Sequence, residues 1–252
     1  LDRSSAASDV YKRQDFGETL DPPSVDVTAH LLEMYGRLGY TKDYAAVSRG
    51  FDYVISEQEE DGSWFGRWGV NYIYGCGAVL PALEAIGEDM SQPYIRRCVN
   101  WLMGHQNDDG GWGESCGSYV DPAIRGIGPS TASQTAWALI GLLSAGEHGC
   151  EAAQKGFSYL TDTQKEDGTW DEQYFTGTGF PGYGAGKRLN TLLDHEETSH
   201  QGLDMPAGFM INYHLYRNYW PLLALGRYSQ AALQDGNRPR YATKGTKIGA
   251  ND

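Results

Sequence analysis

Asp26 and His30 place a carboxylate and an imidazole four residues apart near the start of the chain. Residues at this spacing lie on one face of an α-helix, so we expect the two side chains to be neighbours. Such a pair suits proton transfer, because histidine changes charge near neutral pH and a nearby carboxylate shifts that change. The alternative is a structural histidine with a satisfied hydrogen bond in the core, which the spacing alone favours.

Three aromatic side chains recur at helical spacing further along the chain, namely Phe209, Tyr213 and Tyr216. Positions i, i+4 and i+7 share one helical face, so one helix can present all three rings together. Aromatic faces attract a cation without reacting with it as a nucleophile. The alternative is a buried core stripe, which is the commoner origin of this pattern in an unassigned helix.

Two further groupings do not support chemistry. His195, Glu196 and His200 lie in one stretch, but their spacing does not match the H-E-x-x-H motif, so we expect a solvated loop and no metal site. Residues 75–77 read Gly-Cys-Gly, as at a reactive thioester, yet Ala78 stands where a Glu-Gln pair should begin.

The composition excludes several classes of protein. A formal net charge of −13 argues against a nucleic-acid partner, which needs clustered Lys and Arg. The four cysteines lack C-x-x-C spacing, which argues against a disulfide framework or a zinc knuckle. No run of about 18 apolar residues occurs, so no membrane-spanning helix is expected. A helix that lies on a membrane surface is still allowed.

The candidate site residues need a framework of helices to position them, and one sequence pattern that occurs three times indicates such a framework. In each copy a glutamine stands six residues before a tryptophan, with an acidic residue and a glycine between them. The pairs are Gln58 with Trp64, Gln106 with Trp112, and Gln164 with Trp170. An amphipathic helical period precedes each glutamine. We expect the glutamines to cap backbone groups at helix ends and the tryptophans to cover them, which is a structural and not a catalytic role.

More apolar stretches alternate with the amphipathic ones, over residues 27–38, 72–86, 131–143 and 209–228. Alternation at about 50 residues is typical of helix pairs that each need a neighbour to cover them. We therefore predict an all-α fold, a partial α/α barrel or toroid of four inner and three outer helices with an open edge. No stretch has the period-2 alternation of a sheet.

The two ends do not belong to this predicted barrel. Residues 1–14 carry no helical period and no signal-peptide core, and we interpret them as a non-native leader. Residues 233–252 are polar and glycine-rich, which predicts a disordered tail. The barrel domain is therefore expected over residues 15–232.

The three Gln–Trp copies resemble the QW motif of triterpene cyclases, and three copies in register make the resemblance specific. Further blocks resemble the bacterial squalene-hopene cyclases more closely than the eukaryotic oxidosqualene cyclases. These blocks are residues 15–18, 21–24, 26–30, 62–72, 111–116, 177–182 and 216–228. The resemblance covers roughly residues 15–232, which is less than half of a full-length member.

This resemblance implies an acid-initiated cyclisation of squalene to hopene or hopanol, with no cofactor or metal, as a step of hopanoid biosynthesis. Such an enzyme is classified as an isomerase and, when water is captured, as a lyase. The family carries its D-x-D-D acid upstream of the matched region, and no D-x-D-D occurs in this chain. We therefore expect a C-terminal portion that does not cyclise a substrate alone.

The resemblance also implies roles for individual residues. Asp26 and His30 would support the missing acid, with Arg67 in a buried ion pair to Asp26 and Tyr74 at the same site. The positions that line the substrate cavity and stabilise cations would be Trp68, Phe180, Phe209, Ile211, Tyr213 and Tyr216.

The resemblance further implies partners and a location. The substrate would be squalene or a related linear triterpene, which resides in a lipid bilayer. The full-length protein would be monotopic, on the cytoplasmic face of a bacterial cytoplasmic membrane, and a homodimer.

Two rival interpretations remain on the same fold. A protein prenyltransferase β-subunit also binds an isoprenoid against aromatic rings, but it needs Asp, Cys and His zinc ligands that do not assemble in this sequence. A non-enzymatic repeat module would leave the blocks around Trp68, Phe180 and Tyr216 without a reason. A zinc assay and the upstream coding sequence discriminate among the three.

Overall fold

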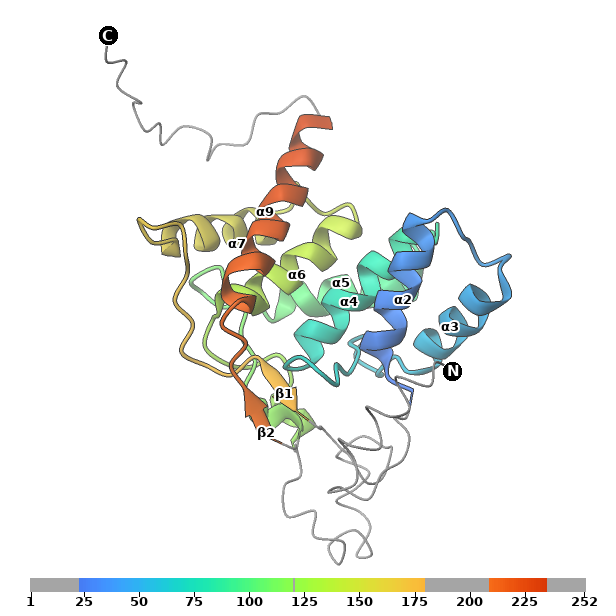
Figure 1. The fold of residues 1–252 in the computed structure, drawn as a ribbon, viewed down its shortest axis with the longest axis horizontal. Helices are drawn as coiled ribbons and strands as arrows, with labels where there is room; N and C mark the ends of the chain where they lie inside the picture. The colour runs from blue at the N-terminus through green and yellow to red at the C-terminus, as the bar shows by residue number, and fades with distance from the viewer. Residues whose placement is uncertain (1–22, 120, 180–208, 235–252) are drawn as a thin grey trace, which may run out of the picture.

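The computed structural model describes residues 23–119, 121–179 and 209–234 (Figure 1). Its helices are α2 (Val25–Arg37), α3 (Ala45–Ser56), α4 (Tyr72–Ala85), α5 (Pro93–Gly104), α6 (Ala132–Ser144), α7 (Glu151–Thr163) and α9 (Tyr216–Gln234). Two short 3-10 helices, η1 (Cys116–Tyr119) and η2 (Pro122–Ile124), and two strands, β1 (Gly177–Gly179) and β2 (Phe209–Ile211), complete the described elements.

Helices α2, α4, α6 and α9 form an inner row in which each packs against the next (Figure 1). The other three helices lie outside this row: α3 packs on α2, α5 on α4 and α6, and α7 on α6. Inner and outer helices therefore alternate along the chain. The predicted all-α fold, a partial α/α barrel, is confirmed.

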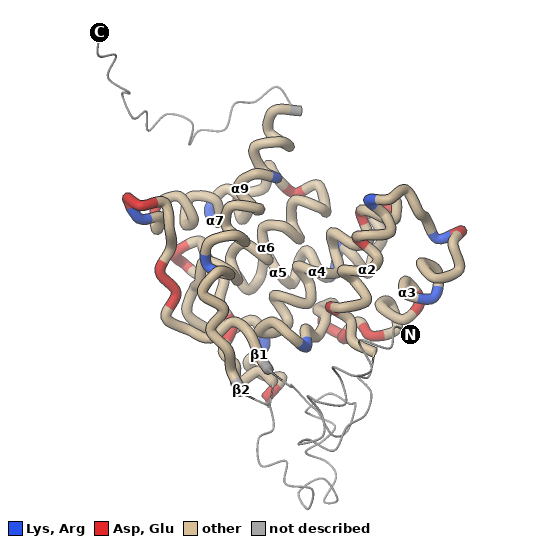
Figure 2. Tube along the Cα trace, viewed as in Figure 1, with Lys and Arg blue, Asp and Glu red and all other residues tan. Residues whose placement is uncertain are grey.

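The two central inner helices are covered on every side. All residues from Tyr72 to Leu83 in α4 and from Ala132 to Leu142 in α6 are buried, and neither span carries a charged residue. A helix that is apolar all round belongs in a core, whereas the outer helices bury only one face. Figure 2 shows the charged residues gathered at the turns and ends, away from the middle of the inner row.

Close helix packing explains the Gly-Cys-Gly run at residues 75–77. A Cβ atom at Gly75 would clash with the carbonyl oxygen of Trp64, and one at Gly77 would lie 2.6 Å from the carbonyl oxygen of Trp137. Only glycine permits such an approach between backbones. Cys76, between the two glycines, is fully buried in the core.

The tryptophans of the three QW copies make one repeated contact. Each indole Nε1 donates to the backbone carbonyl ten residues earlier, at the end of the preceding outer helix. Trp64 donates to Val54 at 2.8 Å, Trp112 to Leu102 at 2.7 Å, and Trp170 to Leu160 at 2.7 Å. All three rings are buried, so each indole satisfies a helix-end carbonyl and covers it from water.

The glutamines of the same copies tie successive outer helices together. Gln58 Nε2 donates to Gly62 O at 2.8 Å and to Tyr94 O in α5 at 2.9 Å. Gln106 repeats this with Gly110 O and with Ala152 O in α7, both at 2.8 Å. These contacts suit the structural role predicted for the repeats, and the absence of a catalytic role stays a prediction.

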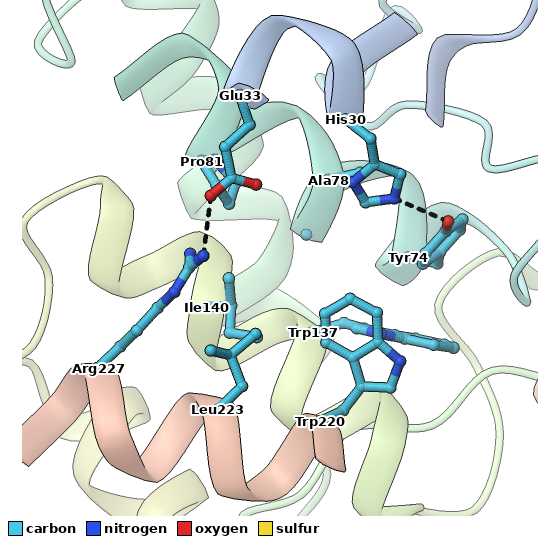
Figure 3. Close-up of a pocket in the computed structure, with 11 residues that line it drawn as sticks. His30, Glu33, Tyr74, Ala78, Pro81, Trp137, Ile140, Trp220, Leu223 and Arg227 are labelled. Carbon is cyan, nitrogen blue, oxygen red and sulfur yellow. Dashed lines mark hydrogen bonds and ion pairs between the residues drawn. The ribbon is translucent and has the colours of Figure 1, made fainter. Parts of the chain in front are cut away.

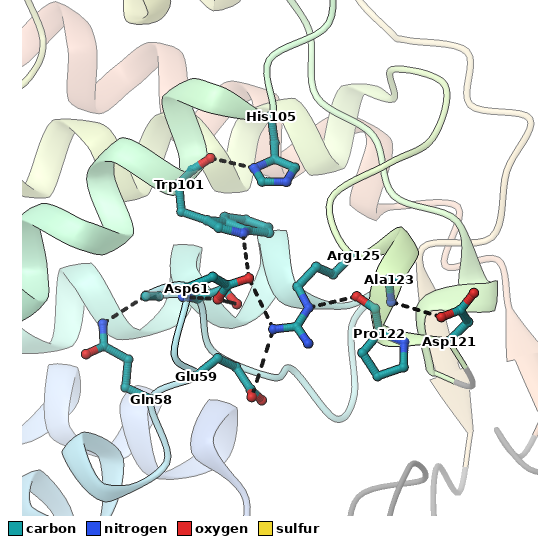
Figure 4. Close-up of polar contacts among 11 residues, drawn as sticks. Gln58, Glu59, Asp61, Trp101, His105, Asp121, Pro122, Ala123 and Arg125 are labelled. Carbon is teal, nitrogen blue, oxygen red and sulfur yellow. Dashed lines mark hydrogen bonds and ion pairs between the residues drawn. The ribbon is translucent and has the colours of Figure 1, made fainter.

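A polar network joins the first QW turn to the loop that holds η2 (Figure 4). The Asp61 carboxylate accepts hydrogen bonds from Trp101 Nε1 and from Arg125 Nη1, both at 3.1 Å. The Arg125 guanidinium also lies over the Tyr72 ring, 4.7 Å from its centroid, at the start of α4. This loop is therefore fixed against both an outer turn and an inner helix.

The expectation that the last inner stretch forms one helix is wrong. Residues 209–228 do not form one helix, because residues 209–211 pair as strand β2 with β1 and α9 begins only at Tyr216. Strands β1 and β2 form a small antiparallel pair, with Thr178 opposite Met210, although no stretch of the sequence shows the alternation of a sheet. Strands of three residues are too short to show a period-2 pattern.

Apolar side chains remain exposed on the two helices that end the inner row. On α2 these are Val27, Leu31 and Met34, followed by Leu38 at its C-terminal cap, and on α9 they include Tyr219, Leu222, Leu223 and Leu233. Such faces are typical of the open edges of a partial barrel. Within the described part of the chain, no helix combines the length and apolar character needed to cross a bilayer.

Candidate functional site

Asp26 lies in the first turn of α2 and is completely buried. Its Oδ2 accepts a hydrogen bond of 2.8 Å from the backbone N–H of Trp68, 42 residues away. This bond ties α2 to the segment that precedes α4. The ion pair expected between Asp26 and Arg67 stays a prediction, although Arg67 is also buried and directly precedes Trp68.

His30 follows one turn later on α2, and its exposed ring meets Tyr74 of α4. His30 Nε2 and Tyr74 Oη are 3.0 Å apart, and which of them donates depends on the tautomer of the imidazole (Figure 3). Burial, and then the negative charge of Asp26, raise the pKa of Tyr74 well above its ordinary value. The phenol therefore stays protonated and can donate to a neutral His30.

The segment of residues 66–71 carries Arg67 and Trp68 and lies beside strand β1. Gly69 pairs with Gly177 in an antiparallel bridge, and Thr178 N donates to Trp68 O at 3.2 Å. The ring of Tyr213 packs so closely on Gly177 that a Cβ atom there would clash with it. Strand β1 thus contacts both the Trp68 backbone and the Tyr213 ring.

A continuous chain of aromatic rings runs from His30 into the inner row. Tyr74 contacts Trp137 of α6 at a centroid distance of 4.8 Å, and Trp137 contacts Tyr216 of α9 at 5.8 Å, edge to face. Tyr216 contacts Tyr213 at 4.6 Å. The negative charge of Asp26 contributes to a raised pKa of Tyr216, after burial and the neighbouring tyrosines, so this carboxylate lies within electrostatic reach of the rings. The arrangement suits a cationic guest.

A pocket of about 110 Å³ opens between the four inner helices (Figure 3). Its lining combines aromatic rings, small aliphatic groups and one ion pair, contributed by His30, Glu33, Tyr74, Gly77, Ala78, Pro81, Trp137, Ile140, Trp220, Leu223 and Arg227. Arg227 of α9 binds Glu33 of α2 at 2.8 Å. This pair joins the first and last inner helices across the pocket.

The structure brings some predicted site residues together and separates others. Asp26, His30 and Tyr74 cluster at the ends of α2 and α4, and Tyr213 contacts Tyr216. The shared helical face expected for Phe209, Tyr213 and Tyr216 is wrong, because only Tyr216 is helical and Phe209 belongs to β2. Half-buried Trp68 and Ile211 flank β1 instead of lining the pocket. Phe180 and the side chain of Phe209 lie outside the described residues.

Several lining residues escaped the sequence analysis. Trp137 lies at the centre of the apolar stretch 131–143, which was predicted only to form an inner helix. Trp220 follows Tyr216 by four residues and continues the aromatic spacing, and Glu33 follows His30 by three on the same face of α2. Extending the Asp26–His30 spacing and the Tyr213–Tyr216 spacing by one helical turn points to Glu33 and to Trp220.

Metal-binding groups do not gather in the part of the chain that the structure describes: no three His, Cys, Asp or Glu side chains there could hold an ion together. His195, Glu196 and His200 lie outside the described residues. Of the four described cysteines, Cys76 of α4 and Cys98 of α5 are buried in the core, whereas Cys116 and Cys150 are half-buried.

Comparison with known proteins gives a consistent result. A family model described as the squalene-hopene cyclase C-terminal domain matches residues 6–185. This range includes residues 6–14 of the segment interpreted as a leader, and that interpretation stays a prediction. A crystal structure of a protein from Actinoplanes has a TM-score of 0.54 and 18% identity, covering 82% of this chain and 55% of its own, which supports the fold alone.

Curated relatives match most of the chain with a minor part of their own length. The chain is 51% identical over 217 residues to a squalene–hopene cyclase of Alicyclobacillus acidocaldarius, covering 86% of this chain and 30% of the relative. It is 42% identical to the squalene–hopene cyclase of Zymomonas mobilis, in a match that covers 89% of this chain and 30% of the relative. A dammaradiene synthase of Dryopteris crassirhizoma is 40% identical, covering 85% and 31%. The chain thus spans about 30% of the length of these relatives.

Proposed function

Because this chain belongs to the family of squalene-hopene cyclase C-terminal domains, we propose that it is the C-terminal portion of an acid-initiated triterpene cyclase. The longer protein protonates a terminal alkene of squalene, closes the rings through successive carbocations, and ends by losing a proton to give hopene or by capturing water to give hopanol. No residue run of the D-x-D-D type occurs in this chain, so the proton donor comes from elsewhere in the longer protein.

The observation that carries this proposal is the contact between His30 and Tyr74 beside the buried Asp26. Tyr74 fixes the imidazole through Nε2, which leaves Nδ1 for a carboxyl group presented from outside the chain. As an imidazolium donating to that carboxyl group, His30 would lower its pKa and make it a stronger acid. Asp26, held by the Trp68 amide, balances the positive charge.

The aromatic rings supply the second part of the function. A carbocation in this site has water-excluding neighbours in Tyr74, Trp137 and Tyr216, whose faces stabilise a cation by about 0.5 to 2 kcal/mol each when desolvated. Their raised pKa values keep the phenols of Tyr74 and Tyr216 neutral and therefore poor nucleophiles. The chain thus offers an environment in which a migrating cation is favoured and is not quenched.

Partners and location follow from the substrate. Squalene partitions into lipid, so we propose that the longer protein works at a membrane surface, monotopic on the cytoplasmic face of a bacterial membrane, and that it is a homodimer. Neither a cofactor nor a metal takes part in the proposed steps.

The test uses the longer protein that contains this chain, incubated with squalene and followed by gas chromatography with mass spectrometry. We expect pentacyclic products from the longer protein and none from the chain alone. His30→Ala should reduce turnover about 100-fold or more, the usual contribution of a proton-transfer group. His148→Ala, in the turn before α7, is the control and should leave turnover within a factor of two or so. An inactive longer protein that is correctly folded, or full turnover with His30→Ala, contradicts the proposal.

A further inference from the structure

The segment of residues 66–71 is buried although it is neither helix nor strand. Arg67, Val70 and Asn71 are at most 7% exposed. Backbone N–H and C=O groups without a partner are costly in such a place, so a buried loop must find partners outside regular structure. The Trp68 amide donates to Asp26, and the other long-range partners of this segment come from residues 43 to 111 positions further along the chain.

Three carbonyl groups of the segment, those of Arg67, Gly69 and Val70, are bound by side chains. Tyr119 Oη donates to Gly69 O at 2.7 Å and lies 3.1 Å from Arg67 O. A phenol has one proton, so the nearer Gly69 carbonyl takes it, and Arg67 O takes the hydroxyl proton of Thr178 at 2.8 Å. Gln134 Nε2 donates to Val70 O at 3.0 Å.

The amide groups where the segment enters α4 are bound by one carboxylate. Glu114 Oε2 accepts from Ile73 N at 2.9 Å and from Asn71 N at 3.2 Å. These N–H groups belong to the first turn of α4, where no preceding carbonyl can reach them and a negative charge is favourable. Burial raises the pKa of Glu114, and the hydrogen bonds from α4 oppose that rise.

Both Tyr119 and Glu114 come from the same stretch between α5 and α6, and both are buried, at 1% and 4% exposure. The Tyr119 ring is also wedged edge-to-face against Phe65, 5.6 Å between centroids. The segment that they hold carries the Trp68 amide, which is the hydrogen-bond donor to Asp26. It also leads directly into the turn of α4 that presents Tyr74.

We propose that Tyr119 and Glu114 are positioning residues: by holding residues 66–71 and the start of α4, they set the Trp68–Asp26 hydrogen bond and the place of Tyr74 beside His30. The importance of that site rests on the proposed function, but the positioning itself does not, and it can be tested without any turnover.

The experiment is amide hydrogen exchange on the purified chain, followed by NMR. In Tyr119→Phe we expect the amides of Trp68 and Val70 to exchange roughly tenfold faster, because one hydrogen bond is worth about that factor. The amide of Thr131, bound to Trp112 O in a neighbouring loop, should keep its rate. Tyr94→Phe is the matched control, since its buried hydroxyl has no hydrogen-bond partner among the described residues.

Glu114 is tested by rescue. Glu114→Gln keeps an oxygen acceptor for the two amides and should preserve protection of Trp68 and Ile73, whereas Glu114→Ala should lose it. If Tyr119→Phe does not fold, Thr178→Val is the substitute variant. It removes the Thr178 hydroxyl, which donates to Arg67 O. Equal acceleration of all protected amides, or unchanged exchange at Trp68 in Tyr119→Phe or Thr178→Val, overturns the proposal. Because no substrate is used, an inactive cyclase would not affect this result.

Discussion

Asp26 and His30 lie one helical turn apart but face different surroundings. Asp26 is buried and bound to a backbone amide, whereas the His30 ring is exposed and held on one side by Tyr74. A fixed carboxylate behind an accessible imidazole suits the proposed role of orienting a third group. The local sequence predicted that the two would be neighbours, but the contact with Tyr74, 44 residues away, was expected only from the resemblance.

At the residue scale, Trp68 offers the clearest test of the cavity. Trp68→Ala in the longer protein should convert part of the product from pentacyclic to partially cyclised compounds, because a lost aromatic face leaves some cations to deprotonate early. Trp68→Phe keeps an aromatic face and should restore most of the pentacyclic product. Product ratios by gas chromatography measure both. An unchanged profile in Trp68→Ala would contradict the prediction that Trp68, which flanks β1 in this chain, lines the substrate cavity of the longer protein.

At the element scale, the repeated Gln and Trp contacts explain how the outer helices keep their order. The same Nε1 contact ten residues back recurs three times, so each outer helix ends in the same way. The glutamine then reaches the next outer helix where one is present. Gln164, in the last copy, donates to Gly168 O at 2.9 Å and has no second acceptor among the described residues.

This difference predicts unequal effects of one substitution. Gln106→Ala removes two hydrogen bonds at a half-buried position and should lower the free energy of unfolding of the chain by about 1 to 3 kcal/mol. Gln164→Ala removes one bond at an exposed position and should cost less than about 1 kcal/mol. Urea unfolding followed by circular dichroism compares them. Equal losses would show that the contact with α7 contributes nothing.

The elements also show where sequence reasoning stops. Helical periods predicted the inner helices α2, α4 and α6 to within two residues, and the Gln–Trp spacing predicted an outer helix before each glutamine, but the start of α9 was missed. Strand β2 was missed because its three residues pair only with another short, glycine-rich strand far away in the sequence. Glu114 and Glu172 each bind the amides that begin an inner helix, and each stands two residues after a QW tryptophan. The spacing of a glutamate two residues after a tryptophan is visible in the sequence. The backbone amides that these glutamates bind are distant in sequence, so the sequence does not reveal the role of the glutamates.

At the scale of the whole molecule, acid stability should depend on Asp61. Burial favours a higher pKa for this carboxyl group, but hydrogen bonds from Ser63 and the charge of Arg125 outweigh burial and lower it. A carboxylate with a lowered folded-state pKa stabilises the fold above its unfolded pKa of about 3.9, and this contribution is lost as the pH falls through the folded value.

Asp61→Asn should therefore melt at a lower temperature than the parent chain near pH 6, and the gap should narrow as the pH approaches about 3. Thermal unfolding followed by circular dichroism across this range measures the gap. Asp162→Asn, at an exposed position of α7, is the control and should show little change at any pH. If the difference in melting temperature does not vary with pH, Asp61 stabilises the fold through its packing and hydrogen bonds and not through its charge.

The exposed apolar faces of α2 and α9 have a practical consequence for handling this chain. Its net charge of −13 makes separate copies repel one another, and that repulsion reaches about 30 Å in 0.01 M salt but only about 3 Å in 1 M salt. The chain should therefore stay monodisperse in dilute buffer. In concentrated salt, the exposed leucines of different molecules should associate and the protein should aggregate, which raises the turbidity of the sample. A mild detergent should prevent this aggregation, because it binds to the exposed leucines.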